Sequence, residues 1–115
     1  MPDKICFISN KEPFEYTLSI LSGKWKLKII YLLACTTPVR YNVLKKNIDA
    51  ITHKMLSTQL KELEQEGIVS RKEYPQVPPK VEYSLIPKGE SLIPIVIAMC
   101  HWGKEHSQPG ARDIG

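Results

Sequence analysis

The segment 52–66, THKMLSTQLKELEQE, concentrates side chains that can hydrogen-bond to bases or pair with phosphates. Leu56, Leu60 and Leu63 recur at helical spacing, which predicts an amphipathic helix. The polar side chains away from that stripe are His53, Lys54, Ser57, Thr58 and Lys61. An ammonium donates to guanine edges or phosphates, and a hydroxyl both donates and accepts. This face therefore predicts readout of base edges in the major groove of double-stranded DNA.

A second candidate surface follows this helix. The segments IVSRKEY (68–74) and KVEYSL (80–85) are typical of two strands, and the loop between them contains three prolines within residues 75–79. Proline fixes φ and lacks an amide donor, so it suits an exposed hairpin tip. We expect this wing, about residues 74–81, to lean on the DNA backbone or minor groove. The side chains predicted to contact the backbone are Lys24, Lys28, Arg40, Lys46, Arg71, Lys72, Gln76 and Lys80.

The charge distribution favours an anionic partner. The 115 residues suit one domain, and their net charge is +4. No acidic residue occurs from Tyr16 to Ile48, whereas acids gather at Glu62, Glu64 and Glu66. An ordinary solvated surface is the alternative for any single lysine. The segregation of acidic from basic residues along the sequence strengthens the interpretation that the partner is a nucleic acid.

The remaining elements must place these two surfaces side by side. Helical spacing predicts helices over about 13–22 and from Trp25 to Cys35, then a short extended piece and a short helix after Tyr41. Asn42 is a candidate cap for that short helix, and Thr52 for the next. A last helix is expected over 88–104. The fold class predicted is mainly α with a small β-hairpin, a winged helix-turn-helix. The organisation expected is an arm (1–11), the domain with a C-terminal dimerisation helix (12–106) and a tail (107–115).

The last predicted helix carries more apolar surface than one core face requires. Leu92, Ile95 or Val96, Met99 and Trp102 form one stripe, and Ile93, Ile97 and Cys100 form another. One stripe can pack on the domain, and a symmetric dimer would bury the other. The alternative is a helix buried on two sides within its own domain. The predicted interface consists of Phe14, Leu18, Ile93, Ile97, Cys100 and Trp102. Pro94 must lie in the first turns of this helix or bend it.

Other chemistry is weakly supported. The chain has no paired nucleophile and base, no phosphate-cradling glycine loop and no zinc-type ligand spacing, so neither an enzyme nor a cofactor or metal is expected. Cys35 and Cys100 are expected to be structural or unreactive, and Cys6 is the candidate for a redox role. The apolar run 92–100 is too short to span a bilayer and no signal peptide is evident, so a cytoplasmic location is expected.

Three segments together carry a family resemblance. LSGKWKLKIIYLL, THKMLSTQLKELEQEGIVSRKEYPQVPPKVEYSL and KGESLIPIV with the later HWG resemble the HxlR-type transcriptional regulators over about residues 12–103. These are small winged-helix, usually dimeric, bacterial DNA-binding proteins. The resemblance implies that Ser57, Thr58 and their neighbours enter the major groove. It also implies that residues 75–80 are the wing and that the terminal helices form the dimer.

One departure concerns signalling. Family members often carry Cys-Pro just ahead of the first helix, and in several that cysteine senses oxidants or electrophiles. Here the pair is Glu12-Pro13, and Cys6 lies six residues earlier. The resemblance therefore does not assign the sensing role to Cys6, and an oxidant or small-molecule signal stays open. The alternative function is a winged-helix protein-interaction module without DNA binding. Such a module need not keep its polar helix face free of acids.

Overall fold

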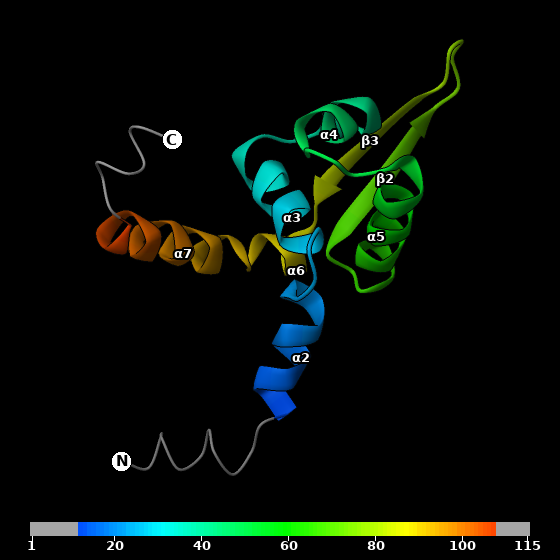
Figure 1. The fold of residues 1–115 in the computed structure, drawn as a ribbon. Helices are drawn as coiled ribbons and strands as arrows, with labels where there is room; N and C mark the ends of the chain where they lie inside the picture. Colours follow the sequence, from blue (N-terminus) through cyan, green and yellow to red (C-terminus); the bar gives the residue numbers. More distant parts are fainter. Residues whose placement is uncertain (1–11, 108–115) are drawn as a thin grey trace.

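The computed structural model describes residues 12–107 and places the predicted elements in the predicted order (Figure 1). The elements are α2 (Glu12–Leu21), α3 (Lys26–Cys35), β1 (Val39–Arg40), α4 (Tyr41–Asn47), α5 (His53–Gln65), β2 (Val69–Tyr74), β3 (Lys80–Leu85), α6 (Pro87–Glu90) and α7 (Ile93–His106). The fold class is confirmed as mainly α with a β-hairpin. The predicted arm, residues 1–11, and residues 108–115 of the predicted tail lie outside the described residues.

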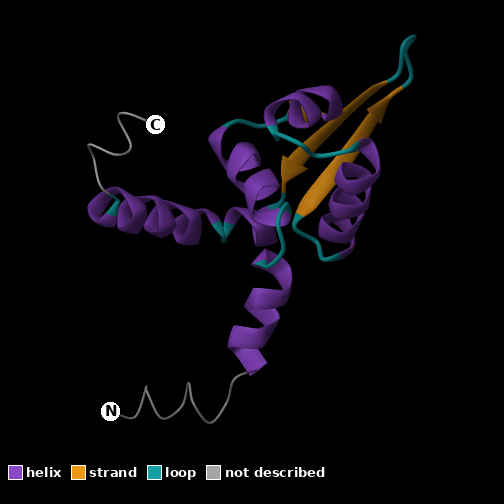
Figure 2. Ribbon diagram, viewed as in Figure 1, coloured by secondary structure: helices purple, strands orange, loops and turns teal. Residues whose placement is uncertain are grey.

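The strands form an antiparallel sheet in the order β1-β3-β2 (Figure 2). β2 and β3 are the two arms of the hairpin, with Val69 opposite Leu85. β1 pairs with the other edge of β3, where Val39 lies opposite Tyr83. These four side chains are buried, so they mark the face of the sheet that turns toward the core. Helices α3, α4 and α5 all contact the sheet, and together they enclose the core.

The core is built from the apolar stripes of these helices. The largest side chains that are fully buried are Ile29, Ile30, Leu33, Leu44, Leu56, Leu60, Leu63, Ile68 and Val69. The stripe predicted on α5 is therefore confirmed. Burying one such side chain contributes about 1.5–3 kcal/mol relative to leaving it in water, so this stripe alone fixes which face of α5 points outward.

The helix-turn-helix consists of α4, a tight turn and α5. Thr52 caps α5 as predicted, because its Oγ1 accepts a hydrogen bond from the backbone amide of Met55 at 3.1 Å. The prediction that Asn42 caps α4 was wrong. The N-cap position belongs to Arg40, whose extended backbone (ψ 149°) still belongs to β1, so the helix begins directly at Tyr41. In the turn, Ala50 adopts a positive φ of 68°.

The single C-terminal helix predicted over 88–104 is instead two helices, α6 and α7. Pro94 lies in the first turn of α7 and cannot donate an amide hydrogen to the preceding turn, so one continuous helix is excluded. The expectation that one apolar stripe of this helix packs along the domain was also wrong, because Val96 is the only residue of α7 that is fully in the core. Met99 and Trp102 are exposed, since α7 leaves the body of the protein after its first turns (Figure 1).

Candidate nucleic-acid interface

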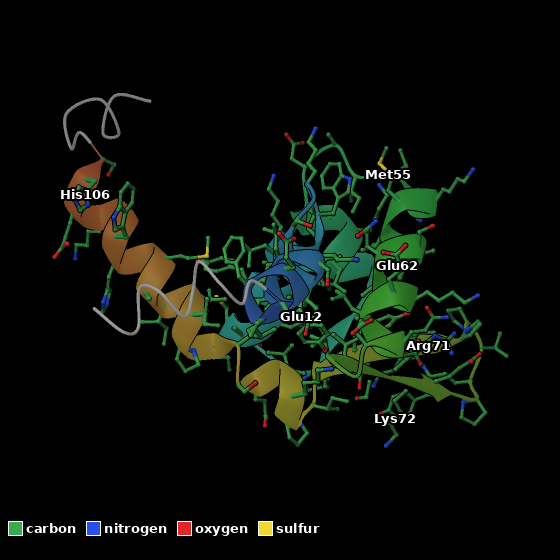
Figure 3. The ribbon with its side chains drawn as sticks, turned by 90° about the horizontal axis from the view of Figure 1, so that it is seen from below. Glu12, Met55, Glu62, Arg71, Lys72 and His106 are labelled. Carbon is green, nitrogen blue, oxygen red and sulfur yellow. The ribbon has the colours of Figure 1, made fainter. Side chains whose placement is uncertain are left out.

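The outward face of α5 carries the predicted base-reading side chains. His53, Lys54, Ser57, Thr58 and Lys61 are all exposed. Met55 is also exposed near the start of the helix, and Glu62 is the first acidic residue along it (Figure 3). Glu62 turns back toward α3, where its Oε1 lies 2.8 Å from the Lys26 ammonium. The first turns of α5 therefore present donors and hydroxyls without a competing carboxylate.

Tyr41, which the sequence did not single out, organises this face. Its hydroxyl lies 3.1 Å from His53 Nδ1 and 3.2 Å from Ser57 Oγ, and 3.3 Å from the His53 carbonyl oxygen. The phenol ring also stacks on the His53 imidazole, with centroids 5.8 Å apart and planes 9° apart. One side chain of α4 thus holds two side chains of α5. Helical spacing alone gives no signal for this contact, because it depends on how the two helices cross.

A concave surface that encloses a volume of about 700 Å³ lies between α5 and the hairpin. Ser57 and Lys61 line it from the helix, and Arg71 and Gln76 line it from the hairpin. Pro78 and Pro79 also line this surface, together with Arg40, Tyr41, Asn42, Glu64, Lys80, Val81 and Tyr83. The structure therefore brings predicted site residues of α5 together with predicted site residues of the hairpin.

The hairpin presents different groups on its two faces. Arg71 lies opposite Tyr83 and Lys72 lies opposite Glu82, so these two neighbours leave β2 in opposite directions (Figure 3). Arg71 faces the concave surface, and its Nη1 lies 3.2 Å from Glu73 Oε1. The neighbouring Tyr83 hydroxyl, and then Glu73, raise the pKa of Arg71 and outweigh the opposing effect of burial. A guanidinium is charged in proteins even without such a shift, so Arg71 presents a positive charge beside α5.

On the opposite face, Tyr74 supports two lysines. The ammonium of Lys80 lies 4.4 Å from the ring centroid and that of Lys72 lies 5.0 Å from it. Lys80 also pairs with Glu82 at 3.3 Å, and the Tyr74 hydroxyl donates to Glu82 at 3.1 Å. Burial raises the pKa of the Glu82 carboxyl, but the Tyr74 hydrogen bond, Lys80 and Arg40 outweigh it and lower the pKa overall. Lys80 is therefore engaged within the hairpin, whereas Lys72 is exposed.

The other predicted backbone contacts divide into two groups. Lys46 is exposed and borders a hollow with Thr52 and His53, next to the start of α5. Lys24 and Lys28 do not line the concave surface. They lie over the Trp25 ring, at 5.0 and 5.6 Å, and border an apolar groove between α3 and α7. The sequence could not separate these lysines from the rest, because all of them fall in one acid-free stretch.

The predicted interface residues lie on the two helices that stand away from the body. Phe14 is 62% exposed and Trp102 is 65% exposed, and Leu18 and Ile97 are also exposed. Ile93 is partly buried against the core. Figure 1 shows α2 and α7 extending in different directions from the winged part of the fold. These helices therefore carry apolar side chains that the described protomer leaves uncovered.

The remaining chemistry of the chain is limited. Cys35 and Cys100, expected to be structural or unreactive, are both exposed, and Cys6 lies outside the described residues. Within residues 12–107, no group of three or more His, Cys, Asp or Glu side chains could hold a metal ion. No helix in the same range is long and apolar enough to cross a membrane.

Comparison with known proteins agrees with this geometry. The sequence profile of the HxlR-like helix-turn-helix family matches residues 20–111. An uncharacterised HTH-type transcriptional regulator of Halalkalibacterium halodurans is 62% identical over 91 residues, covering 79% of this chain and 80% of the relative. The HTH-type regulator YdzF of Bacillus subtilis is 50% identical over 101 residues, covering 88% of this chain and 93% of YdzF.

Solved structures show the same arrangement. The oxidised form of the redox regulator HypR superposes with a TM-score of 0.76 at 45% identity, covering 84% of this chain and 98% of HypR. A transcriptional regulator from Porphyromonas gingivalis W83, named as a MarR-family protein, gives a TM-score of 0.78 at 40% identity, covering 84% of this chain and 94% of that chain. The chain therefore belongs to the HxlR-like helix-turn-helix family and is a transcriptional regulator with a winged-helix fold.

Proposed function

We propose that this regulator binds double-stranded DNA sequence-specifically as a homodimer. The segment 52–66 would lie in the major groove and the wing, about residues 74–81, on the backbone or minor groove. One observation carries the proposal: the exposed first turns of α5 are free of acids and share a concave surface with Arg71 and Gln76 of the hairpin. The proposal includes a cytoplasmic location in a bacterial cell, because a transcriptional regulator acts where the bacterial DNA lies.

The parts have distinct roles in this proposal. The major groove admits an α-helix, and the N-terminal residues of a recognition helix reach the base edges. Lys54, Ser57 and Thr58 would read bases, because they are exposed in those turns. Cations such as Lys46, Arg71 and Lys72 would contact phosphates, which fixes position without reading sequence. Lys24 and Lys28 would reach a backbone only beyond the concave surface.

The homodimer is proposed from the apolar side chains of α2 and α7. Phe14, Leu18, Ile97 and Trp102 are exposed on helices that have little of their own domain to pack against. A two-fold pair of such helices would cover one another. It would also place two recognition helices on a pseudo-palindromic site, with centres roughly 34–36 Å apart or a multiple of this.

The decisive experiment is selection of DNA fragments by the purified protein, followed by titration of the selected duplex and a random duplex over a range of salt concentrations. We expect enrichment of a pseudo-palindromic motif and an affinity that falls steeply with salt. Ser57→Ala and Thr58→Ala should weaken binding to the selected duplex while leaving the random duplex unchanged. Absence of salt-dependent binding would refute the proposal and favour the protein-interaction module.

The same selection can identify a signal. Solved relatives include HypR, which is named as a redox regulator, and Cys35 and Cys100 are exposed in the described protomer. Repeating the selection after mild oxidation therefore tests an oxidant signal directly. A changed yield would assign one, and an unchanged yield would exclude it under those conditions.

A further inference from the structure

One phenol hydroxyl lies where α4 meets the recognition helix, and it has three hydrogen-bonding atoms around it. We propose that Tyr41 is a positioning residue for base readout: it sets which donors and acceptors His53 and Ser57 present to DNA. This inference rests on the proposed function and deepens it, because it assigns a chemical polarity to two positions of the reading face. Tyr41 itself need not touch a base.

Proton counting limits the arrangements. A phenol hydroxyl has one hydrogen to donate and can accept from other donors. Of the three atoms near Tyr41 Oη, the His53 carbonyl is the farthest, at 3.3 Å, and it is also the regular acceptor for the backbone amide four residues on. His53 Nδ1 is the nearest, at 3.1 Å. We therefore assign the Tyr41 hydrogen to Nδ1.

Ser57 completes the chain. Its Oγ lies 3.2 Å from Tyr41 Oη, and either oxygen could be the donor. Once the Tyr41 hydrogen points to Nδ1, the hydroxyl of Ser57 must supply the hydrogen between the two oxygens. The result is a directed chain from Ser57 through Tyr41 to His53. Hydrogen bonds in such a chain polarise one another, which favours one orientation of the whole set.

The orientation has a consequence for recognition. When Nδ1 accepts, a neutral imidazole carries its hydrogen on Nε2, so exposed His53 presents a donor. Because the Ser57 hydroxyl donates its hydrogen to Tyr41, its oxygen presents only acceptor lone pairs to the DNA groove. A donor matches guanine O6 or N7, whereas an acceptor matches the amino group of cytosine or adenine. Losing the Tyr41 hydroxyl would release both side chains to present either polarity.

The contacts around Tyr41 restrict the position of this hydrogen-bonded series of side chains. The parallel stacking of the phenol on the His53 imidazole, at 5.8 Å and 9°, limits rotation of the imidazole. Tyr41 is half-buried and directly follows β1, which pairs with β3 of the hairpin. The hydroxyl is therefore anchored to the sheet that also carries the wing. This anchoring distinguishes it from an exposed tyrosine that contacts α5 only transiently.

The test is Tyr41→Phe, which keeps the stacking ring and removes only the hydroxyl. Affinity for the selected duplex should fall roughly tenfold, within the range that one lost base contact costs, while affinity for a random duplex stays the same. Tyr31→Phe, an exposed tyrosine on α3, is the matched control and should change neither value. Ser57→Ala breaks the same chain from its other end, so the two losses should not add in the double variant.

A second readout reports the proton directly. Nitrogen NMR of the free protein at mildly alkaline pH should find His53 in the Nε2–H form in wild type and mixed in Tyr41→Phe. An unchanged ratio of selected to random affinity, additive losses or an unchanged tautomer would each overturn the inference. If wild type binds no duplex, the proposed function fails instead, and the NMR result still decides the orientation of the chain.

Discussion

Truncation of Trp102 to alanine should separate self-association from folding. This side chain is 65% exposed on α7, and one face of its ring stacks on His106 of the same helix at 4.3 Å. Burying a whole tryptophan covers about 150–250 Å², so roughly 100–160 Å² remains for a partner to cover. At about 25 cal/mol per Å², that surface is worth about 2–4 kcal/mol per protomer if the dimer buries it fully.

Only part of the free energy calculated from buried area appears as binding affinity, because ordering of side chains and imperfect contacts at the interface oppose association. Two symmetric tryptophans contribute, and each 1.4 kcal/mol corresponds to about a factor of ten. Trp102→Ala should therefore weaken dimerisation by at least about a hundredfold. Stability of the isolated protomer should change by less than about 0.5 kcal/mol, as is usual for exposed positions away from special features.

Sedimentation equilibrium over a series of concentrations measures the first quantity, and denaturant unfolding at low concentration measures the second. Val77→Ala is the matched control, because Val77 is 98% exposed at the tip of the hairpin and lies outside the predicted interface. It should dimerise like wild type. The reasoning is refuted if wild type is monomeric at these concentrations, or if Trp102→Ala associates as tightly as Val77→Ala does.

Four further predictions concern stability and binding. A Cβ at Gly89 would clash with the Ile68 carbonyl oxygen and would lie 3.1 Å from the Ile68 carbonyl carbon, so Gly89→Ala should cost about 1–3 kcal/mol in denaturant unfolding. Gly103→Ala, where a Cβ meets nothing within 4 Å, should stabilise by about 0.5–1 kcal/mol. Because folding lowers the pKa of Glu82, its carboxylate stabilises the folded state at pH values above the ordinary glutamate pKa of 4.5. That stabilisation is lost as the pH falls through the folded-state pKa. Glu82→Gln should therefore flatten the acid side of the stability profile, and an unchanged profile would contradict the pairing. Lys72→Ala should reduce the salt slope of DNA binding by about 0.9, and an unchanged slope would remove Lys72 from the phosphate contacts.

The elements that the sequence predicted well are those whose signal is local. The leucine stripe of α5 and its Thr52 cap depend on residues within a few positions of one another, and both are present. The hairpin is local in the same sense, because the proline loop joins adjacent strands. The structure therefore agrees with the sequence for these three local features. The Asn42 cap of α4, also a local signal, failed because β1 runs directly into that helix.

The features that the sequence did not predict depend on contacts between elements that are distant in the sequence. Tyr41 contacts residues twelve and sixteen positions away, so its role requires the crossing of α4 and α5. Lys24 and Lys28 looked equivalent to the other cations, yet they border the groove beside α7. The predicted packing of α7 was wrong because periodicity shows which faces of a helix are apolar. It does not show how many turns of the helix pack against its own domain.

The two halves of the proposed function are physically connected. The Tyr16 hydroxyl of α2 donates to Glu66, which follows the end of α5, at 3.4 Å. Lys88 of α6 approaches the same carboxylate at 4.0 Å and lies 5.3 Å from the centroid of the Tyr16 ring. Because α2 carries exposed apolar residues and α5 carries the reading face, this cluster joins the proposed interface to the proposed recognition helix. In a dimer formed through α2, a change in the angle of that helix would therefore alter the spacing of the two recognition helices, which is the distance that a two-fold DNA site measures.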